Sequence, residues 1–324
     1  MQDKQDWFKC DIDRKTLKAL SRRTDGPGIL HFGAYFTILI GLAAMLVYTW
    51  GTWWAVAVML LYSAVWSFAN AAGHEACHGT PFRNHTLNRT LLYICSWMLS
   101  WEPVSLKWVH ARHHSYTSDV GNDAEYLLPN PVRWADILSL AGGWNQVWHY
   151  NRELVQLTFG YANYFIRESV PASELPAVFR NARLFLLSYI AIIGLSVWMQ
   201  TWLPVCLLLL PRAVGAPVHG ILRITQHGAL ATGVKDHRLT TRTMYLNPLL
   251  RFFYCNMNYH IEHHMFPMVP FHALKALHER VRDQMPVPSK GVSGAMAEVL
   301  ETMTRQKTDT SYVHQPVIQK SGSG

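Results

Sequence analysis

The sequence predicts an all-α integral membrane protein, in which four transmembrane helices form two hairpins and are joined to a cytoplasmic helical cap. Half of the 324 residues are apolar and only 15% are charged, a balance typical of membrane proteins. No Asp, Glu, Lys or Arg occurs from residue 29 to residue 74, and a second apolar region runs from 184 to about 222. Each region is long enough for two helices of about 20 residues.

The first hairpin is predicted from spans at residues 29–50 and 53–72, with the turn at Gly51 and Thr52. Tryptophan side chains favour the membrane interface, and three flank this turn: Trp50, Trp53 and Trp54. Neither span contains Asp, Glu, Lys or Arg.

The second hairpin is predicted from spans at residues 184–201 and 203–222. The later span is interrupted by Pro204, Pro211, Arg212 and Pro217. An arginine near the bilayer centre costs about 2.5 to 3.5 kcal/mol on insertion scales, so a re-entrant or interfacial segment is the alternative for this part of the chain.

Basic residues set the expected orientation, because they concentrate in cytoplasmic segments. Seven precede the first span, whereas the two short turns carry none: Lys4, Lys9, Arg14, Lys15, Lys18, Arg22 and Arg23. The N-terminal stretch is polar, unlike a cleaved signal peptide. We therefore expect a multi-pass membrane protein with both termini in the cytoplasm.

One domain is predicted over residues 1–307, with soluble helices from about 271 to 284 and from about 293 to 305. Residues 308–324 form a polar tail that is expected to be disordered, and its Ser-Gly-Ser-Gly ending resembles an engineered linker.

The net charge of +8 would suit nucleic acid, an acidic partner or an anionic lipid surface. The apolar runs favour the lipid bilayer and argue against nucleic acid. Five cysteines without a CxxC pair encode neither a disulfide framework nor a zinc ribbon, which favours a reducing compartment.

Three windows of five residues hold eight of the 17 histidines. They are box 1 with His74 and His78, box 2 with His110, His113 and His114, and box 3 with His260, His263 and His264. Positions i, i+3 and i+4 of a helix share one face, and imidazole binds iron, zinc, copper or nickel. Eight converging imidazoles exceed what one ion needs, so the boxes predict a site for two metal ions.

Membrane topology gives an independent argument, because the three boxes must face one compartment to build one site. Box 1 ends the second span, box 2 precedes the third, and box 3 follows the fourth. Only with the doubtful span at 203–222 do all three lie on the cytoplasmic side.

The three boxes resemble the HxxxH, HxxHH and HxxHH pattern of the membrane fatty acid desaturase and hydroxylase superfamily. Box 3 continues as Met265-Phe266-Pro267, close to the HHxFP ending of that family, and Thr117 after box 2 matches HHxxT. The resemblance covers roughly residues 29–277. It implies two iron ions held by histidines, with O2 as co-substrate.

The resemblance also implies a ninth ligand just beyond the fourth span, where this chain has His227. Acyl-CoA desaturases carry an asparagine one helical turn earlier that contacts a metal through water, whereas this chain has Arg223 there. That departure puts the local coordination and the substrate class in question, and Gln226 is a possible substitute.

Ligating imidazoles donate their second N–H to a carboxylate or carbonyl, and the nearby acidic residues are Glu75, Asp119, Asp123 and Glu262. Asp123 is the preferred candidate because the family often carries acidic residues shortly after box 2. Asn256 and Asn258 either line the site or cap a helix. Arg212 and His219 in the fourth span contact substrate or ligands, or else pack at the interface. Other histidines are expected at the membrane interface (His31 and His149) or in solvent (His85, His237, His272, His278 and His314).

The expected activity is O2-dependent oxidation of an unactivated C–H bond, which desaturates or hydroxylates a fatty acyl or related lipid. Arg212 or Arg223 would then hold a carboxylate or phosphate of the substrate. The chain lacks heme, rubredoxin and dinucleotide motifs, so its electrons are expected from a separate ferredoxin, or from cytochrome b5 with its reductase.

Three alternatives are compatible with the sequence. Related enzymes oxidise small molecules that are not lipids. Box 1 also fits HExxH, in which two histidines bind zinc and Glu75 would be the general base of a membrane protease. The third alternative is a metal transporter or sensor. The protease leaves the histidines of boxes 2 and 3 without a purpose, and a transporter would spread ionisable groups through its spans.

Overall fold

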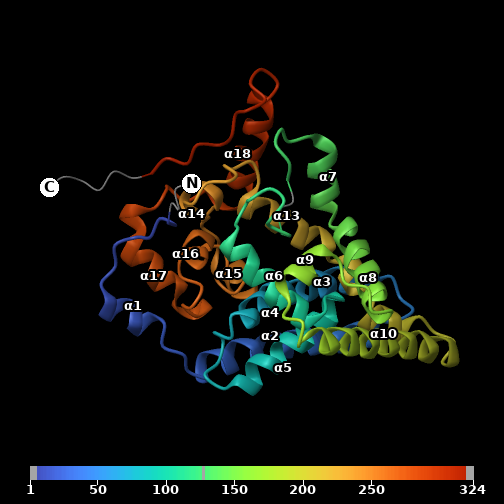
Figure 1. Ribbon diagram of the computed structural model, residues 1–324. Coiled ribbons are helices and arrows are strands. Elements are labelled where there is room, and N and C mark those ends of the chain that lie inside the picture. The colour runs from blue at the N-terminus through green and yellow to red at the C-terminus, as the bar shows by residue number, and fades with distance from the viewer. Residues whose placement is uncertain (1–5, 126–127, 319–324) are drawn as a thin grey trace. The chain divides into compact units, whose positions relative to one another are not determined.

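The computed structural model describes residues 6–125 and 128–318, and these residues form helices, connecting loops and three isolated β-bridges (Figure 1). The prediction of an all-α fold is confirmed. Two compact units share the chain. We call residues 25–111 and 139–221 the membrane unit, and residues 1–24, 112–138 and 222–324 the C-terminal unit.

Three helices of the membrane unit are long and apolar enough to cross a membrane. They are α2 (Gly26–Thr49), the continuous pair α3 (Trp54–Ser67) and α4 (Ala69–Cys77), and α10 (Leu175–Trp198). These helices cover most of the predicted spans at 29–50, 53–72 and 184–201, although α10 begins nine residues before residue 184. Few residues of α2 and α10 are buried, as contact with lipid requires, and Trp53 at the first turn is 91% exposed.

The predicted span at 203–222 is not one continuous helix. The chain forms three short helices there: α11 (Leu203–Leu208), α12 (Pro211–Val214) and α13 (Ala216–His227). Proline lacks a backbone N–H and its ring clashes with the preceding turn, so it fits only the first turn of a helix. Pro204 and Pro211 take such positions, and each therefore marks a new helix start.

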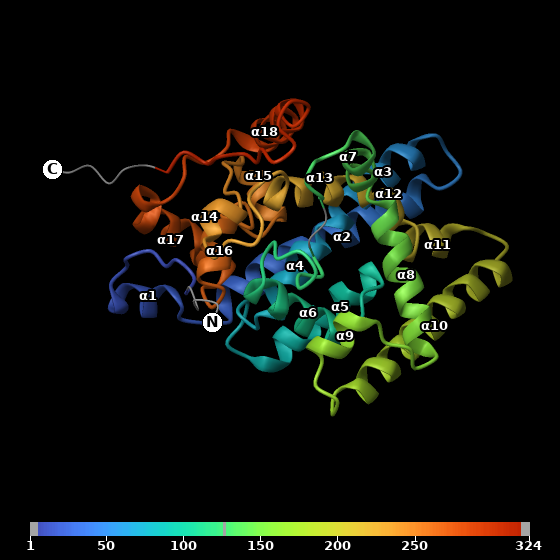
Figure 2. The same cartoon turned by 45° about the horizontal axis from the view of Figure 1, so that its top comes forward.

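Close packing holds this broken segment in the membrane unit, where α12 contacts α3. Gly215, which follows α12, faces the backbone of α3, and a Cβ atom there would overlap the carbonyl oxygen of Ser63. The same unit contains α5 (His85–Leu99), α8 (Trp144–Thr158) and α9 (Tyr164–Ser169), and α8 contacts α10 (Figure 2). The helices α6 (Pro103–Ser115), α7 (Trp134–Gly142) and α13 begin in one unit and end in the other.

The C-terminal unit is built mainly from short helices. They are α1 (Arg14–Leu20), α14 (His237–Thr240), α15 (Pro248–Phe253), α16 (His260–Met265), η1 (Phe271–Ala273), α17 (Leu274–Val281), η2 (Arg282–Gln284) and α18 (Gly291–Arg305). An apolar cluster joins α16 to α17. Ile261 and Met265 of α16 pack in the cluster against Leu274, Leu277 and Val281 of α17. The two helices predicted near the C-terminus correspond to α17 and α18.

Part of the predicted disordered tail lies against this unit. His314 donates its backbone N–H to the Ala229 carbonyl at 2.8 Å, and the Val317 carbonyl accepts from Val287 at 3.0 Å. Residues 319–324, including the Ser-Gly-Ser-Gly ending, lie outside the described residues.

Candidate metal centre

Four histidines of the C-terminal unit converge, although they come from three separate helices. The ligand atoms of His113 from α6, His227 from α13 and His264 from α16 lie within 4.8 Å of one another. His260 joins them, because its Nε2 lies 3.1 Å from Nε2 of His227 and 3.2 Å from Nε2 of His264.

These spacings fit nitrogens that share a metal ion. Metal–imidazole bonds are about 2.1 Å long, so two such nitrogens at right angles lie roughly 3.0 Å apart. His260 and His264 are four residues apart on α16 and therefore project from one face. Since His227 is the last residue of α13, its position depends on where that helix ends.

In His113, His227 and His264, Nδ1 lies close to another polar group of the protein. Nδ1 of His113 lies 2.9 Å from each carboxylate oxygen of Asp123, which is itself buried. Nδ1 of His227 donates to the Thr240 carbonyl at 3.0 Å, and Nδ1 of His264 lies 3.1 Å from Oγ1 of Thr117. With Nδ1 protonated toward these groups, Nε2 presents its lone pair to the centre of the set.

Burial also sets the charge of these imidazoles. Burial is the largest factor that lowers the pKa of His227, to about 3, and it holds the pKa of His264 well below the usual range. Burial acts in the same direction on His113, but the charges of Asp123 and Glu125 outweigh it and raise the pKa of His113. His227 and His264 are therefore neutral at pH 7, which is the form that binds metal.

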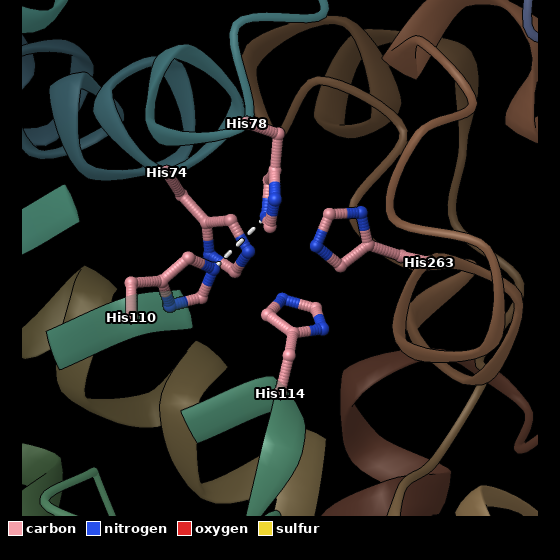
Figure 3. A group of neighbouring side chains, drawn as sticks. All are labelled: His74, His78, His110, His114 and His263. Atoms are coloured by element: carbon pink, nitrogen blue, oxygen red, sulfur yellow. Dashed lines mark hydrogen bonds between the residues drawn. The ribbon is translucent and has the colours of Figure 1, made fainter. Parts of the chain in front are cut away.

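Three further histidines converge within the membrane unit (Figure 3). His78 and His110 face each other with Nε2 atoms 3.1 Å apart, and the ring centroids of His74 and His110 are 4.0 Å apart. This Nε2 separation again matches two nitrogens that bind one ion. Within the C-terminal unit, His114 and His263, the other two histidines in Figure 3, have ring centroids 5.0 Å apart.

A buried network of polar side chains surrounds Glu262 in box 3. The carboxylate of Glu262 has no exposed surface, and it accepts a 2.6 Å hydrogen bond from Oγ1 of Thr243 and a short one from Nδ1 of His278. Nε2 of His278 in turn lies 3.0 Å from the hydroxyl of Tyr245. The network anchors α16 to α17.

Two histidines that were expected to face solvent are buried, and that prediction is wrong for them. His278 is buried because it lies on the inner face of α17. His237 is buried because it stacks on Trp7, with ring centroids 4.1 Å apart. His85 is exposed, as predicted.

Several residues that were expected to orient the ligands or contact the substrate have other partners. Asn256 and Asn258 donate from Nδ2 to the carbonyls of Phe271 and Met244, and Nε2 of Gln226 donates to the hydroxyl of Tyr254. The amide groups of both asparagines therefore hold backbone segments in place.

The charged candidates lie in two places. In the C-terminal unit, Arg223 lies 3.8 Å from the carboxylate of Glu125. In the membrane unit, Arg212 donates to Oγ of Ser100 and lies 4.6 Å from the centre of the Tyr189 ring. His219 is half-buried in α13.

The remaining acidic candidates differ from Asp123. Glu75 is buried and accepts from Oγ1 of Thr80 at 3.1 Å, whereas Asp119 accepts from Nδ2 of Asn122 at 3.2 Å. Of the four acidic residues proposed from the sequence, Asp123 binds the imidazole of a box histidine.

Comparison with known families tests the resemblance seen in the boxes. The sequence profile described as fatty acid desaturase matches residues 29–290, which include all three boxes and His227. The chain belongs to the fatty acid desaturase family. No curated protein matches the chain. Family membership makes the chain an oxidoreductase and, with its apolar helices, a membrane protein, and its histidine sets are compatible with the metal use of that family. It also favours a desaturase or hydroxylase over the protease, transporter and sensor alternatives.

Proposed function

We propose that this desaturase-family protein uses O2 and two iron ions to oxidise an unactivated C–H bond of a fatty acyl or related lipid. The observation that carries the proposal is the orientation of the imidazoles. Nδ1 bonds to other groups of the protein, and Nε2 faces other imidazoles at the spacing of metal ligands.

The nine proposed ligands fall into two groups. His113, His227, His260 and His264 would hold one ion. The other ion would be held by His74, His78, His110, His114 and His263. In the first group, burial keeps His227 and His264 neutral, and Asp123 and the Thr240 carbonyl fix the rings of His113 and His227.

Two irons bound there would supply an oxidant strong enough for a C–H bond, with electrons from a separate ferredoxin or from cytochrome b5 and its reductase. Desaturation consumes one O2, two electrons and two protons, and it yields an alkene and two waters. Hydroxylation with the same inputs yields an alcohol and one water. A small molecule that is not a lipid is the alternative substrate.

The proposed topology places both termini and the iron centre on the cytoplasmic side, with α11–α13 completing a fourth crossing and residues 1–307 acting as one domain. The basic residues before α2 support this orientation. The requirement that all three boxes share one compartment supports the fourth crossing.

The decisive experiment combines metal analysis with product analysis. Purified protein should carry about two irons per chain, and cells expressing it should make an alkene or an alcohol that depends on O2 and reductant. His113→Ala and His263→Ala should abolish turnover and leave membrane insertion intact, whereas His85→Ala should change neither. One tightly bound zinc with peptidase activity independent of O2 would contradict the proposal.

A further inference from the structure

Arg242 is a buried cation whose side chain is directed at the end of the helix that carries His227. Its Nη1 donates to the Thr225 carbonyl at 2.9 Å, and its Nη2 donates to the Gly228 carbonyl at 3.2 Å. Its backbone N–H donates to the Gln226 carbonyl at 2.8 Å. Arg242 therefore binds the carbonyls of the residues immediately before and after His227.

The end of a helix needs such partners. The last carbonyls of an α-helix lack N–H partners within the helix, and they carry a partial negative charge that favours a cation. A guanidinium satisfies two of them at once because its N–H groups form a rigid planar fork. The same chain segment also fixes the imidazole, since Thr240 accepts from Nδ1 of His227.

Glu298 of α18 holds the guanidinium from its other side. Its Oε2 accepts from Nε of Arg242 at 2.7 Å, and its Oε1 accepts from Oγ of Ser289 at 2.7 Å. A buried charge is costly without a paired counter-charge, so Glu298 stabilises Arg242 in this position. His314 lies 3.5 Å from the same carboxylate.

We propose that Arg242 is a positioning residue that fixes His227 for metal binding through the end of α13, and that Glu298 holds Arg242 in place. This inference rests on the proposed function, because it assumes that His227 binds one of two ions. It makes α18, which carries no ligand, a determinant of the ion bound by His227.

A cavity adjoins the side chain of Arg242. Arg242 and Glu298 line a cavity of about 340 Å³, together with Leu230, Lys290 and Val317. A shorter side chain therefore enlarges an existing cavity in the C-terminal unit.

The test is an anaerobic equilibrium dialysis of Fe2+ against the full-length metal-free protein, with two binding equivalents expected for the wild type. Arg242→Lys keeps a positive charge but loses the planar fork, so it should weaken one equivalent 10- to 100-fold, as expected when a group that orients a ligand is lost. The other equivalent should keep its wild-type affinity. His227→Ala provides the reference for a site that lacks this ligand.

Glu298→Gln is the second variant, and it tests the proposal even when Arg242→Lys fails to fold. It should weaken the same equivalent. Glu301→Gln is the matched control, because Glu301 lies three residues along the same helix and is 56% exposed in an ion pair with Arg305. That control should bind both equivalents as the wild type does.

Two results would overturn the positioning role. One is wild-type affinity for both equivalents in Arg242→Lys and Glu298→Gln. The other is equal weakening of both equivalents together with a lower melting temperature of the metal-free protein, which indicates a general loss of structure. A wild type that binds fewer than two irons is a separate failure, because it contradicts the proposed function itself.

Discussion

The carboxylate of Asp123 holds Nδ1 of His113 with both oxygens, each 2.9 Å from the ring nitrogen. The same carboxylate accepts from the backbone N–H groups of Ser118 and Glu125, each at 2.8 Å. These bonds fix the carboxylate, and the carboxylate then fixes the orientation and tautomer of the imidazole.

Asp123→Asn should therefore weaken the binding of the iron held by His113, His227, His260 and His264 by 10- to 100-fold. The amide removes the negative charge that favours the Nδ1–H tautomer of His113. Iron content after dialysis and O2-dependent product yield measure the effect. Asp119→Asn, in the same loop but bonded to Asn122, is the control and should retain iron. Unchanged iron affinity in Asp123→Asn would contradict the orienting role.

Some features were predictable because the sequence carries them locally. The charge-free run from residue 29 to residue 74 gave two spans, and the spacing within boxes 2 and 3 placed their histidines on helices. The prolines that broke the span at 203–222 were also visible. Membrane helices can accommodate proline when neighbouring helices satisfy the freed backbone groups, so the prolines alone do not show where the helix divides.

Burial of His278 was also readable from the sequence. Positions 274, 277, 278 and 281 form the i, i+3, i+4, i+7 stripe of an amphipathic helix, and all four are buried in α17. In contrast, the contact of Arg242 with the residues around His227 follows from tertiary packing of a loop, which has no periodic signal in the sequence.

His278→Ala should destabilise the protein by about 3 to 5 kcal/mol, because it removes one partner of the fully buried Glu262 carboxylate. Thermal unfolding in detergent measures the loss. His278→Asn should recover part of it, since its amide Nδ2 can replace Nδ1 as the donor to Glu262. His272→Ala is the control, because His272 is only half-buried and lies just before α17. Equal melting temperatures for His278→Ala and the wild type would rule out the network as a structural support.

Gly215→Ala should lower stability by about 1 to 3 kcal/mol, the usual cost of overpacking, because the added Cβ overlaps the Ser63 carbonyl oxygen. Backbone strain does not contribute, since Gly215 has a φ of −81° that alanine adopts freely. Gly194→Ala in α10 is the matched control, because a Cβ there has no neighbour within 4 Å. The control should be neutral or stabilising by up to about 1 kcal/mol. Melting temperatures that rank the two variants in the opposite order would contradict the close approach of α12 to α3.

Glu153 of α8 gives the protein a pH-dependent stability that is independent of the metal ligands. Burial is the main factor that raises its pKa from 4.5 to about 7, the charge of Glu102 adds to the rise, and a hydrogen bond from Asn163 opposes it. His149 lies 3.8 Å away, and burial lowers the pKa of His149. The folded protein therefore keeps a proton on Glu153 between pH 4.5 and about 7, whereas the unfolded chain releases it.

The stabilisation from this proton is fully present below pH 4.5 and is lost as the pH rises through about 7, with a total of about 3 kcal/mol. Glu153→Gln is neutral at every pH and retains an oxygen that accepts from Asn163. Its melting temperature should match that of the wild type near pH 4.5 and exceed it by a growing margin up to pH 8. Glu168→Gln, an exposed position in α9, is the control and should follow the wild-type curve. Parallel melting curves for Glu153→Gln and the wild type from pH 4.5 to pH 8 would show that Glu153 does not carry this proton.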